Sequence, residues 1–282
     1  GLVTLDEFIA PETPPLQAVI MAGGFGTRLS PLTDTLPKSM LPIGDRPILE
    51  LIIDQLRQSG VSKVNLTTHY KKDIITNHFG DGDGFGVEIQ YVEEGQPMGT
   101  AGAISLLAGS DDPILVINGD ILTDVNFRSM LDFHQTQQAD MSVAVRYHEF
   151  QLPYGAVTTD GMEITGITEK PMIRNLINAG IYLLNPSVRR LIPSGQRYDM
   201  TDLIGRLIED GRRVVSFPIG EYWIDIGKVE DYDKARADVA RVERNAPVSP
   251  GCWCLFHQGH PPATAYSLPQ YRALRTGPQL RA

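Results

Sequence analysis

The first 140 residues alternate between short apolar runs and amphipathic stretches. Residues 16–22 form an apolar run that ends in a glycine pair, which is the pattern of a buried strand leading into a loop. Between residues 47 and 58, apolar side chains recur at helical spacing, and Gly60 follows as a stop signal. Strands that alternate with helices at this spacing predict a mostly parallel sheet with helices on both faces. The further strands are expected at 64–68, 88–92 and 113–118, and the further helices at 72–78, 99–107 and 127–137.

Beyond residue 140 the spacing of the predicted elements changes. Four strand-like segments follow one another closely, which favours hairpins or a mixed sheet in this half. The expected fold class is therefore α/β, with a doubly wound, mostly parallel, Rossmann-like sheet and an added small β region. These strands are expected at 141–146, 155–159, 163–169 and 179–184, and the last helices at 199–209 and 229–242.

Composition narrows the class of protein. The chain has 282 residues, of which 42% are hydrophobic and 21% charged, as in an ordinary globular protein. No window approaches eighteen consecutive apolar residues, so no membrane partner is expected. The net charge of −9 argues against binding nucleic acid through a basic field. The two cysteines, Cys252 and Cys254, exclude a disulfide framework and favour a reducing compartment, so we expect a cytoplasmic protein.

Proline is concentrated at the end of the chain, where the few charged residues are all arginines. Residues 246–282 hold three arginines, no acid and six of the twenty prolines, without a helical or strand period. This composition predicts a poorly ordered extension. We therefore expect one domain over residues 16–245.

A glycine-rich loop follows the first predicted strand, with the sequence Ala22-Gly23-Gly24-Phe25-Gly26-Thr27-Arg28-Leu29. Glycines let main-chain N–H groups approach an anion, and Arg28 adds a forked cation suited to phosphate oxygens. A P-loop would need Gly-Lys-Ser/Thr at its end, and a dinucleotide fingerprint would need glycine in place of Leu29. A tight turn that needs positive φ is the alternative. Lys38, which lies between Pro37 and Pro42, is a second candidate cation.

Several motifs in order resemble the sugar-1-phosphate nucleotidylyltransferases, which make a nucleotide-sugar from an NTP and a sugar 1-phosphate. The resemblance covers residues 16 to about 240, and it implies a glycosyltransferase-A-like fold. The motifs are the run from Gly23 to Thr33 with Pro37-Lys38, Gly99-Thr100-Ala101-Gly102-Ala103, Asn118-Gly119-Asp120, Glu169-Lys170-Pro171, Asn178-Ala179-Gly180-Ile181-Tyr182 and Trp223-Ile224-Asp225-Ile226-Gly227.

The resemblance implies roles for individual residues. Asp120 and Asp225 match the family's metal-binding aspartates and would hold Mg²⁺, while Arg28 and Lys38 would bind the NTP phosphates. These four are the expected catalytic residues. Lys170 would bind the phosphate of the sugar 1-phosphate, and Glu169 the sugar hydroxyls. The remaining expected nucleotide-binding residues are Ala22, Gly23, Gly24, Gly26, Thr27, Glu93, Gly99 and Thr100, and the remaining sugar-phosphate-binding residues are Gly155, Asn178 and Gly180.

The choice of base depends on the stretch that begins at Glu93-Glu94. Guanine presents adjacent N1–H and N2–H donors, and one carboxylate can accept from both. The arrangement resembles that of mannose-1-phosphate guanylyltransferases, so we expect GTP and mannose 1-phosphate or a similar sugar phosphate as substrates. Thymidylyl or uridylyl transfer to glucose 1-phosphate, and a catalytically silent regulatory homologue, are the alternatives. The presence of Arg28, Lys38, Asp120, Lys170 and Asp225 favours the enzyme.

The sequence says less about the N-terminal residues and about the oligomeric state. Residues 1–9 resemble the last strand and helix of a CBS domain, which precedes the transferase in one subgroup of this family. We therefore interpret residues 1–15 as the remnant of an upstream CBS-like segment or as a leader. The sequence leaves open whether copies of the chain associate into a homo-oligomer.

Overall fold

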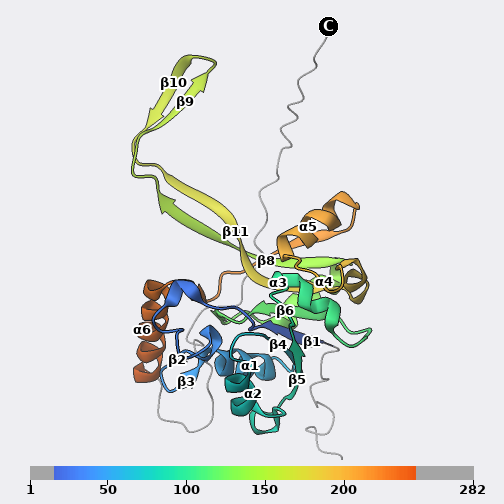
Figure 1. The fold of residues 1–282 in the computed structure, drawn as a ribbon. Coiled ribbons are helices and arrows are strands. Elements are labelled where there is room, and N and C mark those ends of the chain that lie inside the picture. Colours follow the sequence, from blue (N-terminus) through green and yellow to red (C-terminus); the bar gives the residue numbers. More distant parts are fainter. Residues whose placement is uncertain (1–15, 246–282) are drawn as a thin grey trace, which may run out of the picture.

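The computed structural model describes residues 16–245. The predictions for residues 1–15 and 246–282, including the two cysteines, lie outside the described residues. A seven-stranded sheet organises the molecule, with the strand order β12-β8-β11-β6-β1-β4-β5 (Figure 1). Only β11 runs antiparallel to its neighbours, β6 and β8, so the sheet is mostly parallel, as predicted. The strands are β1 (Gln17–Met21), β4 (Lys63–Thr68), β5 (Glu88–Glu93), β6 (Ile114–Asn118), β8 (Met141–Gln151), β11 (Met172–Leu184) and β12 (Val214–Pro218).

Helices cover both faces of this sheet. One apolar cluster joins the sheet to α1, α2, α4 and α6, and a second cluster joins the opposite face to α3 and α5. This arrangement confirms the predicted doubly wound α/β class. None of the helices that the structure describes is both long enough and apolar enough to cross a membrane. The helices are α1 (Ile48–Gln58), α2 (Lys72–Phe79), α3 (Gly99–Gly102), α4 (Phe127–Thr136), α5 (Met200–Glu209) and α6 (Val229–Asn245).

The apolar pattern of the sequence explains the helix that follows the glycine-rich loop. In α1, the six apolar positions 48, 49, 51, 52, 53 and 56 are all buried. The predicted helix at 99–107 is shorter than expected, because α3 passes into a 3-10 turn at Ala103–Leu106. The strand β12 and two short strand pairs had no clear pattern in the sequence. These pairs are β7 (Ile121–Thr123) with β13 (Trp223–Asp225), and β2 (Pro42–Ile43) with β3 (Arg46–Pro47).

The predicted extra β region is a long projection from the sheet. Strands β8 and β11 stay paired well beyond their neighbours, and the hairpin of β9 (Ala156–Asp160) and β10 (Glu163–Thr168) lies at the far end of this ribbon (Figure 1). Because β8 runs parallel to β6, the ribbon leaves the sheet at the carboxyl edge of the parallel strands. That edge is where open α/β sheets bind their ligands.

Candidate active site

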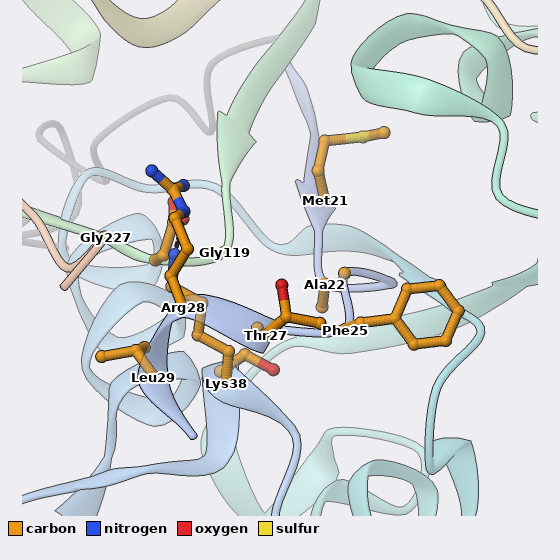
Figure 2. Close-up of a pocket in the computed structure, with 13 residues that line it drawn as sticks. Met21, Ala22, Phe25, Thr27, Arg28, Leu29, Lys38, Gly119 and Gly227 are labelled. Carbon is orange, nitrogen blue, oxygen red and sulfur yellow. Dashed lines mark hydrogen bonds and ion pairs between the residues drawn. The ribbon is translucent and has the colours of Figure 1, made fainter. Parts of the chain in front are cut away.

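A pocket of about 350 Å³ opens at the carboxyl ends of β1 and β6. Figure 2 shows its lining residues, with the side chain of Arg28 on one side and the ring of Phe25 on the other. The glycine-rich loop forms much of the wall, and the segment around Lys38 and the turn after β6 complete it. The lining residues are Met21, Ala22, Gly24, Phe25, Gly26, Thr27, Arg28, Leu29, Lys38, Ser39, Gly119, Asp120 and Gly227.

Glycine is required at two places in this wall. Gly26 has a φ of +65°, and a Cβ on it would lie 2.9 Å from the Cβ of Lys38 and 2.9 Å from the Cγ2 of Thr33. The hydroxyl of Thr33 donates to the carbonyl of Gly26, which fixes this contact. A Cβ on Gly119 would lie 2.8 Å from the carbonyl oxygen of Met21. The missing side chains therefore let three chain segments approach closely enough to form one cradle.

Both predicted phosphate-binding cations reach the pocket. Lys38 forms an ion pair with Oδ2 of Asp120, and both side chains are largely shielded from solvent. The guanidinium of Arg28 lies beside Gly227, since a Cβ there would be 3.7 Å from Nη1 of Arg28 and 3.6 Å from Oδ1 of Asp225. The pocket thus brings together two cations and two carboxylates from distant parts of the chain.

Backbone pairing places Asp225 close to Asp120. In the β7–β13 pair, Asp225 lies opposite Ile121, and the amide of Ile226 donates to the carbonyl of Asp120. Burial raises the pKa of the Asp225 carboxyl, and the neighbouring charge of Asp120 raises it further, while Lys38 and Arg28 lower it. Two carboxylates held this close together favour a cation between or beside them.

The donor set fits a divalent metal. Oδ1 of Asp120 is buried and has no hydrogen-bond partner in the described structure, so one oxygen is left for a ligand. Within residues 16–245, no three His, Cys, Asp or Glu side chains gather as a metal site. Mg²⁺ is commonly held by one or two carboxylates, with substrate phosphates and water completing its shell. Asp120 and Asp225 therefore suit Mg²⁺ that arrives with a phosphate substrate.

The two glutamates of the predicted base-binding stretch lie in different environments. Glu93 is exposed and pairs with Lys72 at 2.7 Å on the surface. Glu94 is 6% exposed, and its Oε2 accepts from the amide of Met98 at 2.9 Å. A Cβ on Gly23 would lie 2.7 Å from Oε1 of Glu94, so this carboxylate lies against the glycine-rich loop. The predicted role of Glu93 stays a prediction, and of the two glutamates it is Glu94 that lies against the glycine-rich loop.

Gly99 and Thr100 support the neighbouring helix. A Cβ on Gly99, whose φ is +76°, would lie 2.4 Å from Oδ1 of Asp199. The amide of Thr100 donates to that same oxygen, and its hydroxyl accepts from the amide of Met200. These hydrogen bonds tie the start of α3 to the start of α5. The predicted contact of Gly99 and Thr100 with a nucleotide stays a prediction.

The predicted sugar-phosphate ligands are divided between two places. Gly180 is buried beside the pocket wall, where a Cβ would lie 2.7 Å from Nδ2 of Asn118, and Asn178 accepts from its amide. Gly155, Glu169 and Lys170 lie on the projecting ribbon and do not line the pocket. Their role also stays a prediction.

Residues not chosen from the sequence also line the site. Ser39 lies in the pocket wall with a buried hydroxyl that has no partner in the described structure. Gly119 precedes the predicted metal ligand Asp120, and its close approach to Met21 is visible only in the fold. Ser39 directly follows Pro37-Lys38, and Gly119 lies within Asn118-Gly119-Asp120. Their positions in or next to these motifs are the sequence signals that could have identified them.

Asp124, a nearby acid without a predicted role, should make stability depend on pH. Burial, and then the charge of Glu221, raises its pKa to about 7 in the folded chain. Because this is above the value of an unfolded Asp, the folded state binds the proton more strongly, and stability falls as the pH rises from about 4 to about 7. We expect Asp124→Asn to gain about 1 kcal/mol, roughly 2–4 °C in melting temperature, at pH 8. The gain should vanish near pH 4.

Thermal melts from pH 4 to pH 8 measure this difference. Asp132→Asn, which changes an exposed acid on α4, is the matched control and should melt as the unmodified chain does. A gain of Asp124→Asn that is the same at every pH would contradict the proton linkage.

Comparisons with known proteins agree on one family. The family model described as nucleotidyl transferase matches residues 17–242. A mannose-1-phosphate guanylyltransferase of Mycobacterium tuberculosis is 34% identical over 85% of the chain, and a UTP–glucose-1-phosphate uridylyltransferase of Synechocystis is 33% identical over 83%. The chain spans 68% and 66% of these two relatives. The crystal structure of HddC from Yersinia pseudotuberculosis with GMP-PN superposes with a TM-score of 0.61, at 26% identity, over 78% of this chain and 98% of HddC.

Proposed function

The chain belongs to the nucleotidyl transferase family, and from this premise we propose that it joins an NTP to a sugar 1-phosphate, giving a nucleotide-sugar and pyrophosphate. The observation that carries the proposal is the pocket itself, where Arg28, Lys38 and Asp120 lie against a glycine-rich wall with Asp225 beside them. Placement of the protein in the cytoplasm stays a prediction from its cysteine usage.

The reaction sets a clear electrostatic demand. A phosphate oxygen of the sugar 1-phosphate attacks the α-phosphorus of the NTP, and the bond from that phosphorus to the bridging oxygen of the β-phosphate breaks. The nucleophile is already anionic, so the site needs charge stabilisation and in-line positioning rather than a general base. Arg28 and Lys38 would bind the triphosphate, and the amides of the glycine-rich loop would approach its oxygens.

Lys38 contacts Asp120 in the structure, so it must exchange this partner for a phosphate oxygen when substrate binds. Asp120 and Asp225 would hold Mg²⁺, which supplies charge neutralisation at the phosphate oxygens when it is bound. The carboxylates themselves fix where that positive charge can lie relative to Arg28.

For the base we propose guanine, read by Glu94. One oxygen of this carboxylate is held by the amide of Met98, and the other lies against Gly23 at the loop. A buried carboxylate in a fixed orientation can accept from both the N1–H and the N2–H of guanine. Uracil and thymine offer a single N–H between two carbonyls, which a carboxylate would repel. The guanylyltransferase among the relatives supports this preference, as does the GMP-PN complex of HddC, and mannose 1-phosphate is the proposed partner substrate.

A single amide substitution tests the base preference. We expect Glu94→Gln to lower kcat/KM for GTP by about 10- to 100-fold, because guanine loses one of two charge-assisted hydrogen bonds. The carbonyl of glutamine can still accept from Met98, so the fold should be retained, and kcat/KM for UTP should rise relative to GTP. Glu93→Gln, which removes only the surface pair with Lys72, is the matched comparison. A loss for GTP in Glu93→Gln and not in Glu94→Gln would reverse the assignment.

A substrate matrix tests the activity as a whole. Each of GTP, UTP, dTTP, ATP and CTP is combined with mannose, glucose and N-acetylglucosamine 1-phosphates, and pyrophosphate release is measured. We expect GTP with mannose 1-phosphate to give the highest kcat/KM. Turnover only with UTP or dTTP and glucose 1-phosphate would favour the alternative transferase. No turnover with any pair would favour a silent homologue.

A further inference from the structure

One end of the pocket is aromatic and has no role in the chemistry described so far. Phe25 stands between Gly24 and Gly26 in the glycine-rich loop, and it lines the pocket while remaining 47% exposed. It belongs to neither of the two buried apolar clusters of the described structure. Figure 2 shows its ring at the opposite side of the pocket from the guanidinium of Arg28. An aromatic ring that faces a pocket without joining the core is typical of a ligand contact.

The ring of Phe25 is held by two other rings, which come from the loop between β4 and α2. Its centroid lies 5.6 Å from that of His69, with the two planes at 86°, and 5.4 Å from that of Tyr70, with the planes at 51°. Edge-to-face and tilted contacts at these distances are favourable arrangements of aromatic rings. Phe25 is therefore oriented by its neighbours, although nearly half of its surface is open.

The loop that carries these two rings is itself fixed. The hydroxyl of Tyr70 donates to the carbonyl of Thr33 at 3.4 Å, and the ammonium of Lys71 donates to the carbonyl of Asp34. The same ammonium lies over the Tyr70 ring, 5.0 Å from its centroid. Lys71 has a φ of +51°, a strained conformation for a residue other than glycine. Such strain persists only where the surrounding structure holds it in place, and it concentrates at ligand sites.

The aromatic end of the pocket is also the end at which Glu94 lies. The Nδ1–H of His69 donates to the carbonyl oxygen of Glu94 at 2.8 Å. A Cβ on Gly23 would lie 2.7 Å from Oε1 of Glu94 and 3.5 Å from the Cβ of His69, so the glycine-rich loop touches both residues. Phe25 follows on the same loop and contacts the same histidine. The pocket is therefore aromatic and acidic at one end and cationic at the other.

This division matches the two ends of a nucleoside triphosphate. The phosphate oxygens need cations, whereas the base offers hydrogen-bonding groups on its edge and an apolar π-face. The carboxylate of Glu94 can serve the edge of a base, but it provides nothing for the face. An aromatic ring provides a partner for the face. Phe25 is the aromatic residue in the pocket wall.

We infer that the base stacks on Phe25, and that this ring, held by His69 and Tyr70, makes the site favour a purine over a pyrimidine. The two fused rings of a purine cover more of an aromatic face than the single ring of a pyrimidine, so a purine gains more from the contact. Glu94 then selects guanine over adenine, because N1 of adenine is an acceptor that a carboxylate repels. That the ligand is an NTP rests on the proposed function.

Equilibrium binding to the full chain tests the stacking. GTP, UTP and inorganic tripolyphosphate are titrated with Mg²⁺ present and no sugar phosphate, and the affinities are measured by calorimetry. We expect Phe25→Leu to weaken GTP binding about tenfold and UTP binding about threefold or less, because leucine stays apolar but removes the ring face. Tripolyphosphate, which has no base, should bind within about twofold of its original affinity. Phe25→Tyr keeps the ring and should retain GTP binding.

The matched control is Leu106→Ala. It changes another exposed apolar side chain, in the 3-10 turn after α3, and this residue does not line the pocket. All three ligands should bind to it as they bind to the unmodified chain.

Phe25→Trp adds a spectroscopic test of contact with the base. A guanine that stacks on an indole quenches its emission, so GTP should quench the introduced indole and tripolyphosphate should leave it unchanged. The unmodified chain, which contains Trp223 and Trp253, is the reference and should respond less to GTP. Emission of Phe25→Trp that responds to GTP no more than the reference does would contradict the stacking.

Three results of the titrations would overturn the inference. Equal losses for GTP and tripolyphosphate in Phe25→Leu would show that the ring only supports the loop, and unchanged GTP binding would show that the base does not use it. Equal losses for GTP and UTP would remove the purine preference. Failure of the proposed function is distinguishable, because GTP would then bind and respond to substitution of Phe25 while no sugar 1-phosphate gives turnover.

Discussion

Asp225→Asn should reduce kcat by about a thousandfold or more, because it removes one of the two carboxylates expected to hold the metal. The variant should fold normally. Burial and the charge of Asp120 already raise the pKa of Asp225, so a neutral side chain of the same shape relieves repulsion in the folded state. Steady-state turnover over a range of Mg²⁺ concentrations measures the loss, and thermal melts measure the stability. Asp120→Asn should lose turnover to a similar extent, and it also removes the ion pair with Lys38.

The matched control is Asp233→Asn, which changes an exposed acid on α6 and should retain turnover. Its role is to separate the loss of a metal ligand from a general change in charge. A doubly substituted Asp120→Asn, Asp225→Asn chain that remains active would rule out the metal assignment. Equal losses in all three single variants would indicate that net charge, and not ligation, governs the rate.

Gly180→Ala should cost about 3 kcal/mol of folding free energy. The position has a φ of +70°, where an alanine is strained, and its Cβ would lie 2.4 Å from Cδ1 of Ile121 and 2.7 Å from Nδ2 of Asn118. Denaturant unfolding measures the change. Gly161→Ala is the control, since its φ is +57° but nothing lies within 4 Å of the added Cβ. It should lose only the strain, about 1 kcal/mol. Equal losses in the two variants would show that contact with Ile121 and Asn118 contributes nothing.

The local sequence pattern predicted most strands of the sheet and the glycine-rich wall of the site. The apolar period of α1 and the glycine-rich loop each lie within one short stretch of sequence, so both could be identified without the fold. The meeting of Lys38 with Asp120, and of Arg28 with Asp225, was expected only through the family resemblance. Their contact depends on strand pairings between distant segments, and no local pattern encodes those.

The choice between Glu93 and Glu94 was open to a sharper prediction. Side chains alternate between the two sides of a strand. Val92 is buried at the end of β5, and the same alternation turns Glu93 outward and Glu94 inward. The length of the projecting ribbon of β8 and β11 could not be predicted in this way. Its strands carry apolar residues as buried strands do. The projection is visible only in the strand pairing, because β12 and β6 pair with β8 and β11 only at the base of the ribbon.

The pairing of β7 with β13 bears on how the enzyme is made. The hydroxyl of Thr123 donates to the carbonyl of Tyr222, and that of Tyr232 to the carbonyl of Pro42, so late segments close over early ones. On the ribosome, the glycine-rich loop, Lys38 and Asp120 emerge well before Asp225. The nascent chain therefore contains most of the pocket wall before it contains Asp225 and Gly227, and the site is complete only when translation has passed β13.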